Sequence, residues 1–276
     1  MDSRRMCPHC RAFITSKDRV CPYCNERVGQ RAVDRRSPGD LLGGLIPGAS
    51  FVTMILVTLN VGMYLLTVIY SMRSGNSRAF MDLDGQTLVY FGAKFGPAIQ
   101  FGQWWRLLTA GYLHGGIFHI FMNMWVLLTV GPQVEQLYGS ARTFVFFTIA
   151  TICGFYVSNL WSGGVSVGAS AGLTGLIGVM IAFGMQHRSA IGDAIKGQYM
   201  FWVGWILVSG FIISGVDNGA HIGGLIGGFG VAYLTGTPRY EGSPIEKVWK
   251  VAAGACILLT AACFLAMYLS FRRFTQ

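Results

Sequence analysis

Four polar side chains within long apolar stretches of this 276-residue chain are of types that can carry out acyl transfer. Ser170 opens a stretch rich in Gly and Ala, and His221 opens another. A serine hydroxyl becomes a nucleophile when a base takes its proton, and the pKa of imidazole suits that task near neutral pH. His119 and Asn123 are four residues apart and so share one helix face, from which both could donate hydrogen bonds to an oxyanion. Together these residues predict attack on a carbonyl carbon by a serine nucleophile.

No carboxylate is expected in or near this cluster, which favours a Ser–His dyad over a triad. Glu135 is expected at the far end of its helix, and Asp217 in the loop before His221. Non-catalytic roles stay open for each residue. A serine in a Gly-rich helix often serves only in helix packing, a buried histidine can relay protons, and an asparagine can form a hydrogen bond between two helices. A transporter would show inverted repeats and several charged groups at the membrane midplane, and the sequence shows neither.

A second cluster lies near the N-terminus, where ten residues separate two Cys-x-x-Cys pairs. This is the spacing of a zinc ribbon, in which four thiolates surround one metal ion. The stretch is too short for a hydrophobic core, so the metal would supply most of its folding free energy. Four Cys ligands leave no open position, which predicts structural zinc and no cofactor for catalysis; two disulfides are the alternative and need an oxidising compartment. The expected ligands are Cys7, Cys10, Cys21 and Cys24.

The composition indicates a small polar head followed by a membrane body. Hydrophobic residues make up 53% of the chain and charged residues 12%, against about 45–50% and about 25% in soluble domains. The net charge of +9 does not indicate a nucleic-acid partner, because the basic residues do not form one face of a polar domain. Nine of the 21 Lys and Arg lie in the first 40 residues, and most others lie between long uncharged runs. The basic segment 29–48 is expected to be a linker that could lie against anionic lipid.

Six charge-free runs of 20 to 45 residues predict membrane-spanning helices, because about 20 residues cross a hydrocarbon layer of about 30 Å. The longest run turns at the Gly-rich segment 161–168 and accommodates two helices. The predicted fold class is therefore an all-α polytopic membrane protein with seven spans. They are expected near 50–71, 115–135, 142–160, 169–187, 199–216, 219–236 and 248–269.

The placement of Lys and Arg in the short loops favours a cytoplasmic N-terminus, although Arg272 and Arg273 count against it. With this orientation the second, fourth and sixth spans all begin at the outer surface. Ser170, His119, Asn123 and His221 are then expected at one depth near that surface. The chain shows no organelle-targeting segment, and we expect a multi-pass protein of a bacterial plasma membrane.

Four motifs resemble, in order and spacing, those of the rhomboid family of intramembrane serine proteases. They are Trp105-Arg106, His114-x4-His119-x3-Asn123, Gly168-x-Ser170 and Ala220-His221-x2-Gly224-x3-Gly228. The resemblance covers about residues 50–236 and implies a six-helix rhomboid-like core followed by a seventh transmembrane helix. With the head and the linker, the expected domains are 1–28 (zinc ribbon), 29–48 (linker), 49–236 (catalytic core) and 237–276 (inner loop and additional helix).

Position by position, the resemblance implies a role for each motif residue. Ser170 would be the nucleophile and His221 its general base. The oxyanion would be bound by His119, Asn123 and the backbone N–H of Ser170. Trp105 and Arg106 would lie in the loop after the first span, and Glu135 resembles a carboxylate at the inner end of the second. Two positions depart from the pattern: Ala171 stands where many members have Gly, and Thr174 where an aromatic ring commonly packs on the catalytic histidine.

The resemblance implies a serine endopeptidase that cleaves transmembrane segments of other membrane proteins near the outer face. A substrate helix must unwind locally, which small or helix-breaking residues would ease. The expected partners are transmembrane substrates and the lipid bilayer, with the ribbon available to recruit a cytoplasmic partner. The alternative is a catalytically silent relative that binds transmembrane clients as an adaptor or chaperone, and the presence of both Ser170 and His221 argues against it.

Overall fold

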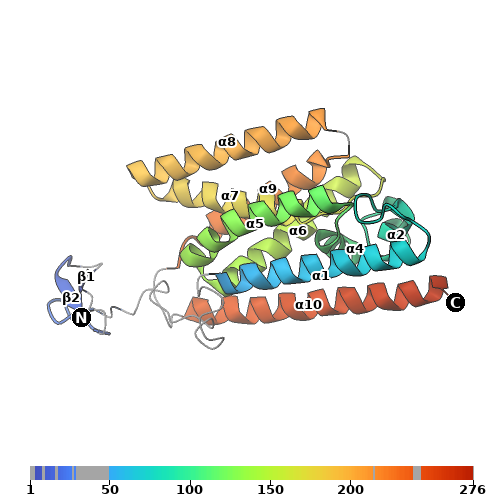
Figure 1. Ribbon diagram of the computed structural model, residues 1–276. Coiled ribbons are helices and arrows are strands. Elements are labelled where there is room, and N and C mark those ends of the chain that lie inside the picture. Colours follow the sequence, from blue (N-terminus) through green and yellow to red (C-terminus); the bar gives the residue numbers. More distant parts are fainter. Residues whose placement is uncertain are drawn as a thin grey trace.

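The computed structural model describes residues 4–7, 10–15, 18–26, 28, 50–213, 215–238 and 244–275. In the N-terminal part, the strands β1 (Arg4–Met6) and β2 (Phe13–Thr15) pair antiparallel, with Arg5 opposite Ile14. The linker expected at 29–48 lies outside the described residues. From residue 50 onward the described chain is mostly helical (Figure 1).

Each predicted span corresponds to one long helix. These helices are α1 (Phe51–Arg73), α5 (Ile117–Tyr138), α6 (Ser140–Trp161), α7 (Ser170–Gln186), α8 (Ala190–Ile212), α9 (Asn218–Thr235) and α10 (Pro244–Thr275). The connection between α1 and α5 contains short helices: α2 (Gly85–Tyr90), α3 (Gly96–Gln100), α4 (Arg106–Thr109) and the 3₁₀ turn η4 (Ala110–Tyr112).

Two helices extend beyond the expected spans. α8 begins at Ala190 rather than near residue 199, because Ser189 caps it by accepting the Gly192 N–H at 3.1 Å. Its first turns include Asp193 and Lys196, which form an exposed ion pair. α10 has 32 residues. A charge-free run locates the hydrocarbon part of a helix, whereas capping residues outside the hydrocarbon set its ends.

The chain is a multi-pass membrane protein. By length and hydropathy, α1, α5, α6 and α10 can each cross a bilayer, and α7 is a shorter apolar helix of 17 residues. That all seven long helices cross the membrane stays a prediction. Large apolar side chains cover the outward surface of the bundle, as expected for contact with lipid; they include Phe118, Trp125, Leu160, Phe201, Trp205, Phe211 and Leu258.

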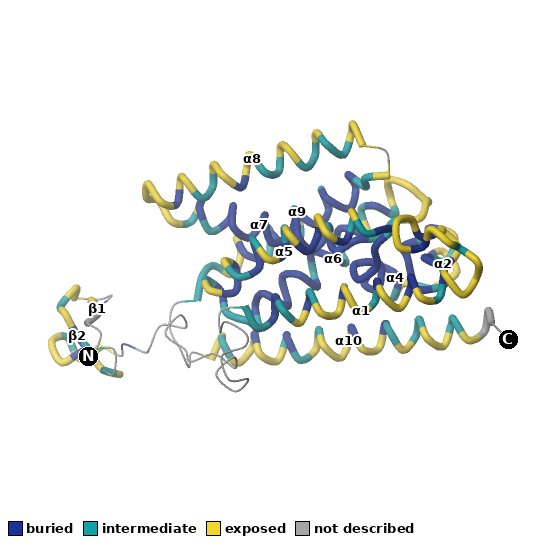
Figure 2. Tube along the Cα trace, in the orientation of Figure 1, coloured by how far each residue is buried: buried dark blue, intermediate teal, exposed yellow. Residues whose placement is uncertain are grey.

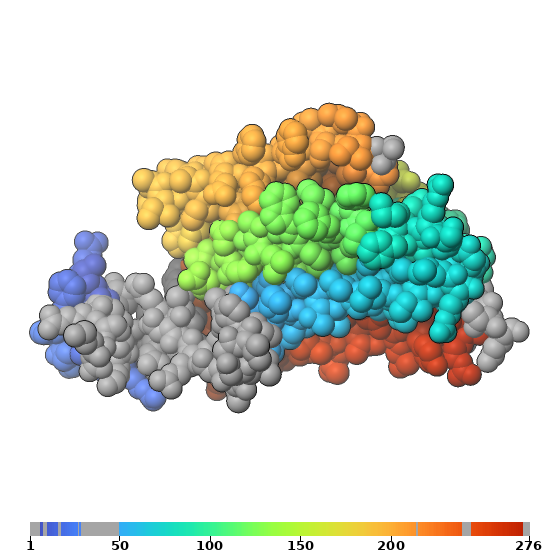
Figure 3. Space-filling view, in the orientation of Figure 1, coloured from blue at the N-terminus to red at the C-terminus, as the bar shows by residue number. Residues whose placement is uncertain are grey.

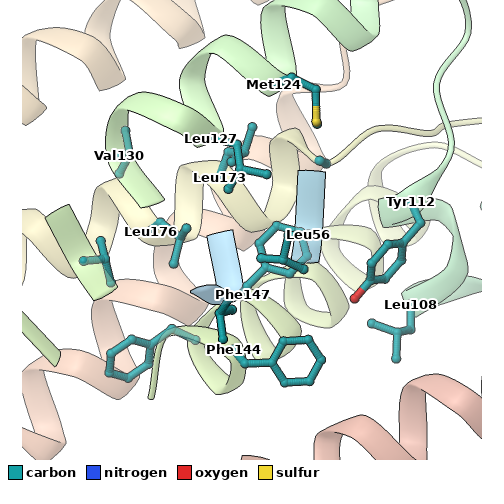
Figure 4. Close-up of a cluster of buried hydrophobic side chains, with 14 of the residues drawn as sticks. Leu56, Leu108, Tyr112, Met124, Leu127, Val130, Phe144, Phe147, Leu173 and Leu176 are labelled. Carbon is teal, nitrogen blue, oxygen red and sulfur yellow. The ribbon is translucent and has the colours of Figure 1, made fainter. Parts of the chain in front are cut away.

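α7 and α9 form the centre of the bundle and pack on each other and on α6 (Figure 1). α7 is buried along most of its length, whereas α8 and α10 expose much of theirs (Figure 2). In the space-filling view, α5, α1 and α10 lie side by side across one face (Figure 3). Side chains from α1, α5, α6 and α7 meet in a closely packed apolar cluster between the helices (Figure 4), which includes Leu56, Leu127, Phe147, Leu173 and Leu176.

The end of the bundle opposite Ser170 is fixed by buried charged groups. Glu135 of α5 accepts the N–H groups of Val52 and Thr53 at 2.8 and 3.0 Å, and thereby caps the start of α1. Arg142 of α6 forms an ion pair with Glu246 at 2.6 Å, and its guanidinium lies 4.8 Å from the centre of the Trp249 ring. These contacts attach α1 to α5 and α10 to α6.

Candidate active site

Ser170 is the first residue of α7, and the loop before it adopts a conformation that favours glycine. Gly168 has a φ of +131°, and its N–H donates to the carbonyl oxygen of Ala110 at 3.0 Å, which ties the loop to η4. A Cβ on Gly168 would lie 2.8 Å from Nε2 of His119 and 3.6 Å from Oγ of Ser170. The structure therefore brings the His119 ring and the Ser170 hydroxyl next to the same glycine.

His119 and Asn123 lie one turn apart on α5, as their spacing predicted. Nδ1 of His119 accepts the Gly115 N–H at 3.4 Å, so the hydrogen of the neutral ring is on Nε2, the atom nearest Gly168. Nδ2 of Asn123 donates one hydrogen to the carbonyl oxygen of His119 at 2.8 Å and keeps a second. The ring of His114 contacts the His119 ring edge to face, with centroids 5.1 Å apart. Both predicted oxyanion residues therefore retain an N–H donor.

His221 lies in the first turn of α9 and is buried. Its Nδ1 forms no hydrogen bond with the part of the chain that the structure describes. A Cβ on Gly154 of α6 would lie 2.7 Å from the Cβ of Ala171 and 2.7 Å from the carbonyl oxygen of Ala220. Because Ala171 follows Ser170 and Ala220 precedes His221, α6 brings the starts of α7 and α9 together.

α9 lies directly on α7 through Gly224. A Cβ on Gly224 would lie 2.0 Å from the carbonyl oxygen of Ala171 and 2.8 Å from Oγ1 of Thr174. The Thr174 hydroxyl donates to the carbonyl oxygens of Ser170 and Ala171, each at 3.0 Å. Position 174 thus supplies a hydroxyl to the helix backbone in place of a ring that could pack on His221.

Asp217 has a structural role that the sequence reasoning missed. It is the N-cap residue of α9, where its Oδ1 accepts the Ala220 N–H at 3.0 Å and its Oδ2 accepts the Ser158 hydroxyl. The carboxylate is therefore engaged at the helix start, and the described structure contains no hydrogen bond between it and the His221 ring. The available signal was position alone, because an Asp directly before an apolar helix is a typical N-cap.

Trp105 and Arg106 lie in the connection between α1 and α5, where the resemblance placed them. Arg106 is buried and donates to the carbonyl oxygens of Val89 and Ala93 at 2.7 and 2.9 Å. Its guanidinium lies 4.6 Å from the centre of the Trp105 ring. These contacts fold the connection back on itself next to η4, the turn that binds the loop before Ser170.

Comparison with known proteins identifies the family. The family model "Rhomboid domain" matches residues 101–238, which is half of the chain. The chain belongs to the rhomboid family. The matched residues include every motif position described above, from Trp105 to Gly228.

Several curated rhomboid proteins are similar to this chain. It is 40% identical over 154 residues to Rhomboid protease GluP of Bacillus subtilis (strain 168), covering 56% of this chain and 30% of that protein. It is 33% identical over 193 residues to Rhomboid-like protease 1 of Toxoplasma gondii, covering 66% and 64%. It is 34% identical over 170 residues to RHOMBOID-like protein 7 of Arabidopsis thaliana, covering 60% and 54%. The chain thus spans less than two thirds of the length of each.

The four N-terminal cysteines precede the matched rhomboid domain and form a candidate metal centre. Their sulfur atoms all lie within 4.8 Å of one another, with Cys7 3.7 Å from Cys24 and Cys10 3.6 Å from Cys21. A disulfide needs about 2.05 Å, whereas thiolates at about 2.3 Å from one tetrahedral metal ion are about 3.8 Å apart. Each Cys-x-x-Cys pair is followed by a residue with positive φ, Arg11 or Asn25. Their backbone N–H groups donate to the carbonyl oxygens of Cys7 and Cys21. Two equivalent turns thus bring four sulfur atoms close enough together to hold a single metal ion.

Proposed function

We propose that this rhomboid protein is an intramembrane serine endopeptidase that cleaves transmembrane segments of other membrane proteins. Ser170 is the proposed nucleophile and His221 the proposed base. The observation that carries the proposal is the contact of Gly154 with both Ala171 and Ala220, the chain neighbours of Ser170 and His221. That contact sets the first turns of α7 and α9 against each other, as a nucleophile and its base require.

The chemistry follows the two-step pattern of serine hydrolases. The proton of the Ser170 hydroxyl passes to His221 as Oγ bonds to the substrate carbonyl carbon, whose oxygen becomes an oxyanion. The C–N bond then breaks, and the proton passes from His221 to the leaving amine. Water, activated in the same way, hydrolyses the acyl ester on Ser170 and restores the enzyme.

The oxyanion would form close to the start of α7. Nε2–H of His119 lies beside Gly168, and the Ser170 N–H is in the first turn of α7, where the helix dipole adds positive potential. Asn123 supplies a further N–H from the same face of α5. A donor aimed at developing negative charge lowers the barrier by about 3–4 kcal/mol in other serine hydrolases.

The proposed substrate is a membrane-spanning helix that enters the site locally unwound, since only an extended peptide exposes its carbonyl to a nucleophile. With a cytoplasmic N-terminus, cleavage occurs near the outer face of a bacterial plasma membrane. The cysteine cluster would hold structural zinc, because its four-thiolate donor set suits that ion. The zinc ribbon would recruit a cytoplasmic partner.

A serine-directed probe and the membrane proteome test the proposal together. Detergent-solubilised protein should label with a fluorophosphonate, and labelling should disappear in Ser170→Ala and fall sharply in His221→Ala. Cells that carry the wild-type chain should release ectodomains that cells with Ser170→Ala retain. Absence of labelling in folded wild-type protein would overturn the assignment.

The second candidate function is a silent rhomboid that binds transmembrane clients as an adaptor or chaperone. The observation that favours it is Thr174, whose hydroxyl is bound to the α7 backbone where a ring would steady His221. Labelling and client binding together separate the two functions. In an active protease Ser170 of the wild type is labelled and Ser170→Ala is not, whereas in an adaptor neither is labelled and both bind transmembrane clients.

A further inference from the structure

Lys94 is a buried lysine that holds the loop before Ser170. Its side chain is in the connection between α1 and α5 and only 1% of the residue is exposed. Its ammonium donates to the carbonyl oxygens of Ser162 and Gly164. Its backbone forms a two-bond bridge with Ser166, with both N–O distances at 3.0 Å. Segment 162–166 is therefore fixed to Lys94 at several points.

Asp217 holds the start of α9 in the same cluster. Its carboxylate accepts the Ala220 N–H and the hydroxyl of Ser158 at the end of α6, which continues directly into segment 162–166. Burial alone would raise the pKa of Asp217, but these hydrogen bonds and the positive charge of Lys94 hold it below its usual value. The half-buried carboxylate of Asp217 thus joins the end of α6 to the start of α9, while Lys94 holds the loop before α7.

These groups adjoin both proposed catalytic residues along the chain. Asp217 is four residues before His221, and segment 162–166 ends four residues before Ser170. We infer that Asp217, together with Lys94, is a positioning residue that fixes the first turn of α9 relative to the loop before Ser170. The inference rests on the proposed function, because it assigns Asp217 the task of holding the base against the nucleophile.

The chain contains a matched control for this role. Asp84 caps α2 by accepting the Thr87 N–H at 2.7 Å, and it also accepts the Ser71 hydroxyl at 2.7 Å. Like Asp217, it joins a helix start to a serine on a long neighbouring helix. The helix that it caps carries neither proposed catalytic residue. If only the loss of a helix cap mattered, Asp217→Ala and Asp84→Ala would behave alike. If Asp217 positions the proposed catalytic residues, only Asp217→Ala lowers labelling of Ser170.

The first measurement is the rate at which a fluorophosphonate labels Ser170 in the full-length protein in detergent, resolved into the maximal rate and the half-saturating concentration. Asp217→Ala should lower the maximal rate about tenfold or more, because small displacements of a catalytic base cost that much, and leave the half-saturating concentration within about twofold. Asp217→Asn keeps an oxygen for the Ala220 N–H and should restore most of the rate. Asp84→Ala should stay within about twofold of wild type.

The second measurement does not depend on activity. Hydrogen exchange of the backbone amides at 219–222 should accelerate in Asp217→Ala and stay slow in Asp217→Asn and Asp84→Ala. If wild-type protein is not labelled, the proposed function fails, while the exchange data still decide whether Asp217 holds α9. If wild-type protein is labelled, and Asp217→Ala matches Asp84→Ala in both rate and exchange, the positioning role is overturned.

Discussion

Gly228 of α9 lies against the backbone of Gly175 in α7: a Cβ on Gly228 would be 2.1 Å from the Gly175 carbonyl oxygen. No side chain can enter that space unless the two helices separate, and Gly224 makes a similar contact one turn nearer to His221. The close approach of two helices through small residues is typical of membrane proteins. Here it sets the distance between the helices that carry the proposed base and nucleophile.

Gly228→Ala should therefore lower both stability and labelling of Ser170. Forcing a methyl group into a closely packed contact costs about 1–3 kcal/mol, and more where backbone must move. Thermal unfolding in detergent measures the first effect and fluorophosphonate labelling the second. Gly230→Ala is the control on the same helix, since its Cβ would meet nothing within 4 Å; equal unfolding temperatures for the two variants would contradict the prediction.

Glu135 should be essential to stability at the other end of the bundle. Its carboxylate accepts two N–H groups from the first turn of α1 and the hydroxyls of Thr53 and Ser140. Glu135→Ala leaves those donors buried without an acceptor, which should cost about 2–4 kcal/mol, and Glu135→Gln should cost less. Denaturant unfolding measures both. The neighbouring exposed Gln136→Ala should change little, and a loss as large as that of Glu135→Ala would refute this account.

Arg142 should be needed to attach α10 to α6. It donates to the Gly236 carbonyl oxygen at 2.9 Å, pairs with Glu246 and lies over the Trp249 ring. Arg142→Ala should destabilise the protein by about 2–3 kcal/mol, somewhat less than for a fully buried ion pair, because Glu246 retains access to water. Unfolding temperatures should show this loss, whereas Arg188→Ala, which removes an exposed arginine, should leave them within about 1 °C.

The cysteine cluster should bind about one zinc ion per chain. Elemental analysis of purified protein should find that ratio, and Cys21→Ser should abolish it, since Cys21 is a buried member of the cluster. Cys153→Ser, which changes a cysteine of α6, should keep the metal. Labelling of Ser170 should survive in Cys21→Ser, because the proposed zinc is structural. A metal content unaffected by Cys21→Ser would exclude this site.

Acid should destabilise the protein partly through its N-cap carboxylates. Hydrogen bonds that outweigh the effect of burial hold the pKa of Asp84 and Asp217 below their usual value of 3.8. A carboxylate with a lowered folded-state pKa stabilises the fold above its unfolded pKa, and this contribution is lost as pH falls through the folded value. Lowering the pH from about 5 to about 3 should therefore reduce the unfolding temperature less in Asp84→Asn/Asp217→Asn than in wild type. Asp193→Asn, at an exposed position, should behave as wild type does.

The sequence was sufficient to locate the long helices, because charged residues are costly in hydrocarbon and their absence marks the runs that can form spans. It was insufficient for their ends: α8 continues through Asp193 and Lys196, where water replaces lipid and a cap decides where the helix starts. The short helices between α1 and α5 were also not predicted. Their shape depends on buried Arg106, whose carbonyl partners are 13 and 17 residues away.

For the candidate site, motif spacing was enough to select Ser170, His119 and Asn123, and the two residues of α5 do lie one turn apart. Spacing could not reveal that Lys94 holds segment 162–166, because 68 positions separate it from Ser162 and it looks like an ordinary loop residue. Contacts of that kind arise only when the connection after α1 folds against the end of α6. The sequence therefore supplied the proposed reacting groups, whereas the groups that hold them emerged only from the structure.

The shortness of α7 has a consequence for the products of the proposed cleavage. Its 17 residues span about 25 Å, about 5 Å less than a typical hydrocarbon layer. If α7 runs along the membrane normal with Gln186 at one boundary of that layer, Ser170 lies about 5 Å inside the other boundary, the length of one or two extended residues. The released fragment would therefore keep, at its cut end, one or two apolar residues of its former membrane-spanning helix. The mass of the fragment would reveal these residues.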